Sequence, residues 1–175
     1  MGSTMAFRRS DLERIGGFAV IADYIADDYQ LGHRIHALGL KCVLSDVIVE
    51  THLAGNWLDV WCHQIRWART IRVSKFWGYL GLPVTFATCW AVVLWAAGRA
   101  DLALAVFALR MFMAFISGWF VIRSVDVLRL FWAIPFRDLF AAAVWAVGSF
   151  GRTVIWRGRK LEIDRGGRIL IPADP

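Results

Sequence analysis

Two long apolar runs constrain this chain more than any other feature of its sequence. Residues 80–98 contain no charged side chain, and residues 102–122 contain only one, Arg110. A helix of about 20 apolar residues crosses the ~30 Å hydrocarbon layer of a membrane, so each run is long enough to span it. Only residues 99–101 separate the runs. The sequence therefore predicts a transmembrane helical hairpin over residues 80–122, which returns the chain to its starting side.

Composition and charge indicate partners at a membrane. Hydrophobic residues make up 58% of the chain, with 10 Trp and 12 Phe, and the formal net charge is +6. The basic residues flank the apolar segments and form no nucleic-acid-binding motif. We therefore expect a membrane surface and an anionic substrate as partners, and no nucleic acid. Cys42, Cys62 and Cys89 are widely spaced and lack a metal-ligand pattern, which is typical of reduced structural thiols.

The first part of the chain alternates between predicted strands and helices, which favours an α/β fold. A short strand is expected over residues 4–8. A helix over residues 11–15 follows it, because Ser10 and Glu13 form the S-x-x-E pattern of a capping box.

A second helix is predicted over residues 27–38, where Leu31, Ile35 and Leu38 recur at helical spacing on one face. Residues 41–50 are rich in Val and Ile and alternate weakly in polarity. We predict a strand there.

A third helix is predicted over residues 57–75, and it is amphipathic. There is no acidic residue between residues 60 and 100, whereas basic residues stand just before the first apolar run, at Arg66, Arg69, Arg72 and Lys75. A helix of this kind is expected to lie on an anionic leaflet, so residues 55–79 are predicted to form an interfacial segment.

The third apolar region, residues 130–150, is interrupted by Pro135, Arg137 and Asp138. We interpret residues 123–151 as interfacial or re-entrant helices. A tilted third span, with the tail outside, is the alternative. The tail over residues 152–175 is basic, which places it in the cytoplasm by the positive-inside tendency, and its residues 153–171 are predicted to form a β-hairpin around 164–167.

The first candidate site is the acid pair Asp27 and Asp28, at the start of the second predicted helix. A helix N-terminus stabilises negative charge, so a carboxylate there stays ionised and can accept a proton from a hydroxyl group. Simple capping of the helix is the alternative, since Asp is common at that position.

The second candidate site lies on the interfacial helix, in the sequence HQIRWART at residues 63–70. Guanidinium groups can neutralise a departing diphosphate, and Trp and Gln can shape the place of an acceptor. A basic amphipathic anchor with an interfacial Trp is the alternative.

Several separated motifs share the order and spacing of one known family. They are GSTMAFRR at residues 2–9, LERIGGF at 12–18, ADDY at 26–29, HQIRWART at 63–70 and WRGR at 156–159. On these motifs the chain resembles the ceramide glucosyltransferase-like family, especially its bacterial members, which include hopanoid-biosynthesis glycosyltransferases. The likeness covers nearly the whole chain.

The resemblance implies the C-terminal part of a GT-A-type glycosyltransferase domain followed by membrane helices. It implies a UDP-sugar donor, a lipid hydroxyl acceptor and a divalent cation, Mg or Mn, at the cytoplasmic face of a bacterial inner membrane. The catalytic general base of the family falls on Asp28, with Asp27 beside it. The family signature (Q/R)-x-x-R-W falls on His63, Arg66 and Trp67, with His63 in place of Gln or Arg. Substrate-binding roles are implied for this signature and for the neighbouring Gln64 and Arg69.

The family carries its nucleotide-binding strands and D-x-D-type metal ligands upstream of the GSTMAF segment, where this chain starts. We therefore assign no metal ligand, describe residues 1–54 as a partial catalytic segment and expect the chain alone to be inactive. A non-catalytic membrane-anchored remnant or partner subunit is the alternative function. A polysaccharide synthase is disfavoured, because two clear spans are few for a conducting channel. An in-frame coding stretch upstream of Met1 with a D-x-D-like motif would favour the enzyme.

Overall fold

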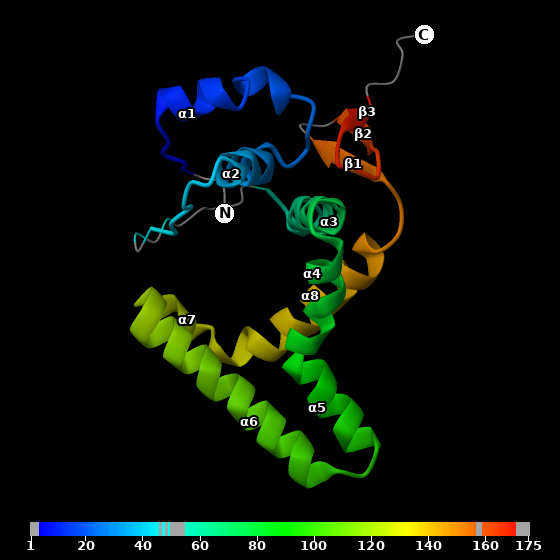
Figure 1. Ribbon diagram of the computed structural model, residues 1–175. Helices are drawn as coiled ribbons and strands as arrows, with labels where there is room; N and C mark the ends of the chain where they lie inside the picture. Colours follow the sequence, from blue (N-terminus) through cyan, green and yellow to red (C-terminus); the bar gives the residue numbers. More distant parts are fainter. Residues whose placement is uncertain (1–3, 46, 48, 50–54, 157–158, 171–175) are drawn as a thin grey trace. The chain divides into compact units, whose positions relative to one another are not determined.

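A computed structural model describes residues 4–45, 47, 49, 55–156 and 159–170 (Figure 1). The chain divides into two compact units, one of Met1–Phe76 with Phe150–Pro175 and the other of Trp77–Ser149. The described residues are mostly helical, and one three-stranded antiparallel sheet lies in the first unit. The predicted α/β character is therefore limited to this small sheet.

The N-terminal segment contains only helices among its described residues, namely α1 (Arg9–Arg14), the 3-10 helix η1 (Phe18–Val20) and α2 (Asp27–Ala37). The predicted strand over residues 4–8 is wrong, since these residues pair with no strand. The predicted capping box is also wrong, because α1 begins after Arg8 and places Ser10 inside the helix. Instead, Glu13 accepts a hydrogen bond from Arg9 at 3.1 Å, one turn earlier.

Helix α2 confirms the second predicted helix almost to the residue. Leu31 is buried, and Ile35 and Leu38 are half-buried on the same face. The strand predicted over residues 41–50 is absent from its described residues, where Val43 is 78% exposed. A strand requires a hydrogen-bonded neighbour, and no strand pairs with this segment in the described part of the chain. Residues 46, 48 and 50 lie outside it.

Helix α3 (Trp57–Ser74) confirms the third predicted helix, and its start is fixed by a cap that sequence analysis missed. The Asn56 side chain accepts hydrogen bonds from the backbone N–H groups of Leu58 and Asp59, at 2.8 and 3.2 Å. Asp59 in return accepts from the backbone N–H of Asn56 at 2.9 Å. This reciprocal arrangement satisfies N–H groups that have no partner within the helix.

The tail folds into three strands rather than two, β1 (Thr153–Trp156), β2 (Arg159–Ile163) and β3 (Ile169–Leu170), in the order β1-β2-β3. The predicted turn at residues 164–167 joins β2 to β3. Residues 157 and 158, between β1 and β2, lie outside the described residues. The buried core of this unit gathers side chains from α2, α3 and the sheet, namely Leu31, Ile65, Ala68, Val154 and Ile163, together with Ile21 and Ala26.

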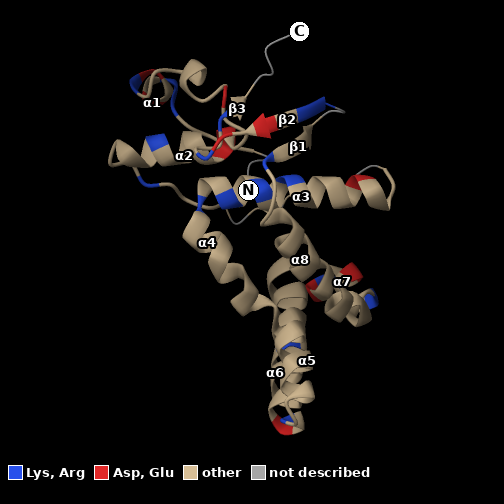
Figure 2. Cartoon of the chain, turned by 90° about the vertical axis from the view of Figure 1, so that its right-hand side faces the viewer, with Lys and Arg blue, Asp and Glu red and all other residues tan. Residues whose placement is uncertain are grey.

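The second unit is entirely helical in its described residues. Its elements are α4 (Phe76–Gly81), η2 (Leu82–Thr85), α5 (Ala87–Ala96), α6 (Ala100–Ile116), the π-helix η3 (Ser117–Ile122), α7 (Val125–Arg129), η4 (Phe131–Ala133) and α8 (Ile134–Gly148). Figure 2 shows few Lys, Arg, Asp or Glu residues on these helices, in contrast to the basic residues on α3. Apolar side chains are exposed along α5 and α6, as expected for surfaces that contact hydrocarbon.

The segment predicted as a transmembrane hairpin forms two contacting helical arms, α5 and α6, whose details differ from the prediction. Helix α6 continues into η3, and the combined Ala100–Ile122 is long and apolar enough to cross a membrane. The first predicted span is not one straight helix, because Phe76–Thr85 and Ala87–Ala96 meet at a 55° bend. Phe131–Gly148 also meets the length and composition criteria. Pro135, Arg137 and Asp138 do not interrupt α8, since Pro135 stands in its first turn, where no N–H is needed.

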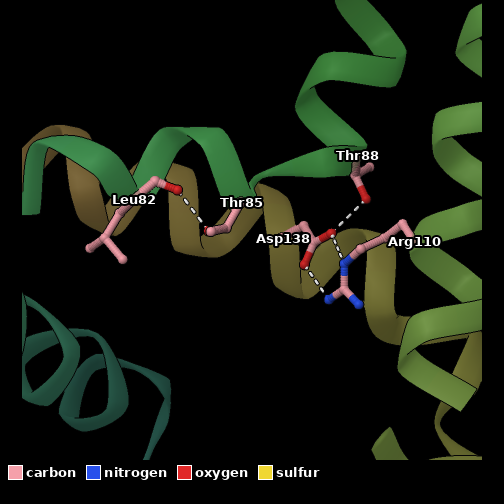
Figure 3. A network of polar contacts seen from close by, with 5 residues as sticks. All are labelled: Leu82, Thr85, Thr88, Arg110 and Asp138. Carbon is pink, nitrogen blue, oxygen red and sulfur yellow. Dashed lines mark hydrogen bonds and ion pairs between the residues drawn. The ribbon is translucent and has the colours of Figure 1, made fainter. Parts of the chain in front are cut away.

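Two groups of polar contacts join helices of the second unit. Asp138 on α8, which is 5% exposed, accepts hydrogen bonds from Arg110 on α6 and from Thr88 on α5 (Figure 3). At the other end of α8, the Tyr79 hydroxyl donates to the carbonyl of Trp145, whose indole N–H donates to the Tyr79 carbonyl at 3.0 Å. Helix α4 and the end of α8 therefore lie together, and the α5–α6 connection lies at the opposite end of the unit (Figure 1).

Candidate functional site

The acid pair occupies the first two positions of α2, directly after the buried Ala26. Oδ1 of Asp27 accepts a hydrogen bond from the Asp28 N–H at 2.8 Å, and Oδ1 of Asp28 accepts from the Tyr29 N–H at 2.7 Å. These N–H groups belong to the first turn of the helix, where backbone N–H groups have no acceptor within the helix. Both carboxylates therefore lie at the positive end of the helix dipole.

The two acids differ in exposure. Asp27 is exposed, whereas Asp28 is half-buried. Among the described residues Oδ2 of Asp28 accepts no hydrogen bond, so this oxygen can receive a proton from a hydroxyl group. The geometry is compatible with a role as helix cap and with a role as general base. A carboxylate that accepts first-turn N–H groups through one oxygen can still accept a proton on the other.

His63 and Arg66 contact each other on α3. Nη2 of Arg66 lies 3.3 Å from Nδ1 of His63. A guanidinium group can only donate, so this contact requires a neutral His63 whose Nδ1 is the acceptor. Burial, and then the positive charge of Arg66, lower the pKa of His63 from its ordinary value, which favours the neutral ring. Burial also lowers the pKa of Arg66.

Trp67 completes a group that we call the α3 cluster, defined as His63, Arg66 and Trp67. The rings of His63 and Trp67 are 5.1 Å apart between centroids, with a 40° angle between their planes. Trp67 is 47% exposed. The cluster therefore offers an aromatic face, a cation and a neutral imidazole on one side of the helix. Gln64 is half-buried and points about 100° around the helix from His63.

Arg69 differs from the other predicted substrate-binding residues. Its Nε donates to the carbonyl of Phe150 at 3.1 Å, and its Nη1 donates to the carbonyl of Thr153. Arg72 donates similarly to the carbonyl of Gly151. These bonds join α3 to the segment that leads into β1, so the geometry favours a structural role for Arg69.

The acid pair and the α3 cluster belong to the same unit, but no hydrogen bond or ring contact joins them among the described residues. Residues next to each site contact the tail: Tyr24, before the acid pair, binds Arg168, and Arg69, on the helix of the α3 cluster, binds the start of the sheet. Sequence analysis missed the contact between Tyr24 and Arg168, because these residues are far apart in the chain and carry no local pattern. A search of the described residues for three or more His, Cys, Asp or Glu side chains that could hold a metal ion finds none.

Comparison with protein families gives one match. The family model described as Glycosyl transferase family 21 matches residues 1–169. The curated proteins and the solved structures gave no match. The family match covers both candidate sites, the apolar helices and nearly all of the tail.

Proposed function

The chain belongs to glycosyltransferase family 21, and from this premise we propose that it is an inverting enzyme at the cytoplasmic face of a bacterial inner membrane. In the proposed reaction a sugar, glucose or N-acetylglucosamine, moves from a UDP-sugar to a hydroxyl group of a ceramide- or hopanoid-type lipid. The observation that carries the proposal is the half-buried Asp28 at a helix N-terminus, in the same unit as a cationic, Trp-bearing helix that precedes apolar helices.

In the proposed mechanism the Asp28 carboxylate takes the proton of the acceptor hydroxyl. The hydroxyl oxygen then attacks the anomeric carbon, and the bond between that carbon and the diphosphate oxygen breaks. Attack opposite the leaving group inverts the configuration. Arg66 stabilises the negative charge of the departing diphosphate, and neutral His63 orients Arg66 through their contact.

The family resemblance also implies a divalent cation. The described residues do not fit one, because they provide no group of three suitable ligands. No step of the mechanism is therefore assigned to a cation.

The proposed topology has two crossings, formed by bent α4–α5 and by α6. Arg69 on α3 binds carbonyl groups of the tail, which supports a common side for both segments. The chain between α3 and the tail must then cross the membrane an even number of times. Phe131–Gly148 meets the length and composition criteria for a span, so the shared side of α3 and the tail decides how α8 is placed. With bent α4–α5 and α6 as the two crossings, the even number of crossings favours a re-entrant α8.

The test of substrate identity uses membranes that contain the full-length protein. They would be incubated with labelled UDP-glucose or UDP-N-acetylglucosamine and with extracted lipids. We expect a labelled lipid whose mass equals acceptor plus one hexose or N-acetylhexosamine. Transfer to water alone, or to a growing polysaccharide, would refute a lipid acceptor.

A further inference from the structure

The segment directly before the acid pair is bonded to the tail. The backbone N–H of Ile25 donates to the Gly167 carbonyl at 3.0 Å, and the N–H of Ile169 donates to the Asp23 carbonyl at 2.7 Å. Tyr24 and Arg168 therefore face each other as an antiparallel pair that exchanges no backbone hydrogen bond of its own. In such pairs the two Cα atoms and the side chains are closest.

The two side chains of this pair also bind each other. Nε of Arg168 donates to the Tyr24 hydroxyl at 3.1 Å, and the guanidinium carbon lies 5.3 Å from the centre of the Tyr24 ring. The contact combines a hydrogen bond with a cation–π interaction. It is exposed to solvent, so its removal is expected to leave the fold intact.

The turn between β2 and β3 is shaped to make this contact. Oδ1 of Asp164 accepts hydrogen bonds from the N–H groups of Gly166 and Arg168, at 2.7 and 2.8 Å. Gly167 has a φ of +83°, a conformation that favours glycine. A Cβ added to Gly167 would lie 3.2 Å from Cγ2 of Val73, so the turn packs against α3.

The sheet is also anchored to α3 at this same end, because Thr153 pairs with Glu162 and the Ile163 N–H donates to the Arg152 carbonyl, directly before the turn. Arg69 and Arg72 donate to carbonyl groups at residues 150, 151 and 153, and Val154 of β1 is buried in the core. One end of the tail sheet thus contacts both the segment that leads into Asp27 and Asp28 and the helix that carries the α3 cluster.

We propose that Tyr24 and Arg168 are positioning residues, through which the tail sheet fixes the acid pair relative to the α3 cluster. The inference rests on the proposed function. In this arrangement the segment after the last membrane helix completes the transferase site, although none of its side chains touches the reacting atoms.

The contact is tested first without any activity measurement, by a disulfide in the full-length protein with Cys42, Cys62 and Cys89 replaced. Cα atoms of such antiparallel pairs are about 4.5 Å apart, within the ~4.4–6.8 Å range of disulfides. Mild oxidation of the variant Tyr24→Cys with Arg168→Cys should form the cross-link in membranes. The control Asp23→Cys with Arg168→Cys should not, because neighbouring residues point to opposite faces. Equal cross-linking of both pairs, or of neither, would overturn the proposal.

The positioning role is then tested by kinetics. Arg168→Ala should lower kcat by up to about 10²-fold, the effect of a ~1 Å misplacement, with the donor KM within about twofold. Exposed Arg165 lies in the same turn, and Arg165→Ala should leave both constants unchanged. The oxidised 24–168 pair should restore kcat, and its reduction should lower kcat again.

The results separate the two claims. A change in KM alone, or an unchanged kcat in Arg168→Ala, would contradict the positioning role while wild-type transfer continues. If the cross-link forms and the unaltered protein transfers no sugar, the proposed function fails, and the catalytic purpose of the contact fails with it.

Discussion

Arg110 and Asp138 form a two-pronged ion pair between α6 and α8, with Nε to Oδ2 at 2.8 Å and Nη2 to Oδ1 at 2.7 Å (Figure 3). The Thr88 hydroxyl donates to the same Oδ2 at 2.8 Å. An isolated charge within a membrane is strongly unfavourable, whereas paired charges that face the interior of a helix bundle are accommodated. The pair thus explains how two apolar segments can each carry a charged residue.

The first prediction concerns this pair. Asp138→Ala should destabilise the protein by about 3–5 kcal/mol, because it leaves Arg110 as an uncompensated charge. The double variant Arg110→Leu with Asp138→Leu should regain most of that stability, since apolar residues need no partner. Denaturant unfolding in detergent micelles would measure both, with exposed Arg137→Ala as the control. A double variant as unstable as Asp138→Ala would contradict the prediction.

The second prediction concerns the pH dependence of stability at His63. Its pKa in the folded protein is lowered, so folding favours the neutral ring. The resulting stabilisation is fully present above the unfolded pKa of about 6.5, and is lost as the pH falls through the lower folded pKa. The His63→Gln variant has no titratable side chain at this position. Its unfolding free energy should therefore change less with pH between the folded and the unfolded pKa of His63. Identical pH slopes for the two proteins would refute the assignment.

The third prediction separates two roles for Arg69. If Arg69 holds the tail, Arg69→Ala should speed hydrogen exchange over residues 150–156 and lower kcat. Gln64→Ala, on the same helix, should leave exchange in the tail unchanged. Hydrogen exchange with mass spectrometry would measure this. An unchanged exchange rate with a raised donor KM would instead support substrate binding by Arg69.

The fourth prediction concerns topology. In a cysteine-free background, single cysteines would be placed at Arg99 in the α5–α6 connection and at Arg165 in the tail. An impermeant thiol reagent should label Arg99→Cys from outside the cell and Arg165→Cys only in inverted vesicles. Labelling of both from one side would contradict a two-crossing topology and would favour the tilted third span or a different pairing of spans.

Sequence patterns predicted the elements that local physics determines. Helices α2 and α3 carry apolar residues at helical spacing, and the turn at residues 164–167 contains the Asp and Gly that such turns need. The strand predicted at residues 41–50 was wrong in its described part, because a strand depends on a partner that its own residues do not specify. Hydropathy likewise gave no sign of the bend before Ala87.

The candidate site was predictable only in part. The acid pair and the α3 cluster stand in short motifs, so their residues could be found from the sequence. The pairing of Tyr24 with Arg168 joins residues far apart in the chain, and so does the pairing of Arg110 with Asp138. Neither has a periodic signal. A lone Arg in one apolar run and a lone Asp beside another could have suggested the second pair.

The most direct test of the account is sugar transfer by Asp28→Asn in membranes that contain the full-length protein. The substitution keeps the size of the side chain and an oxygen that can accept the Tyr29 N–H, but an amide cannot act as the base. We predict that labelled lipid falls by about 10²–10⁴-fold, while the amount of protein inserted in the membrane stays the same. Turnover equal to that of the unaltered protein would contradict the assignment of Asp28 as the base.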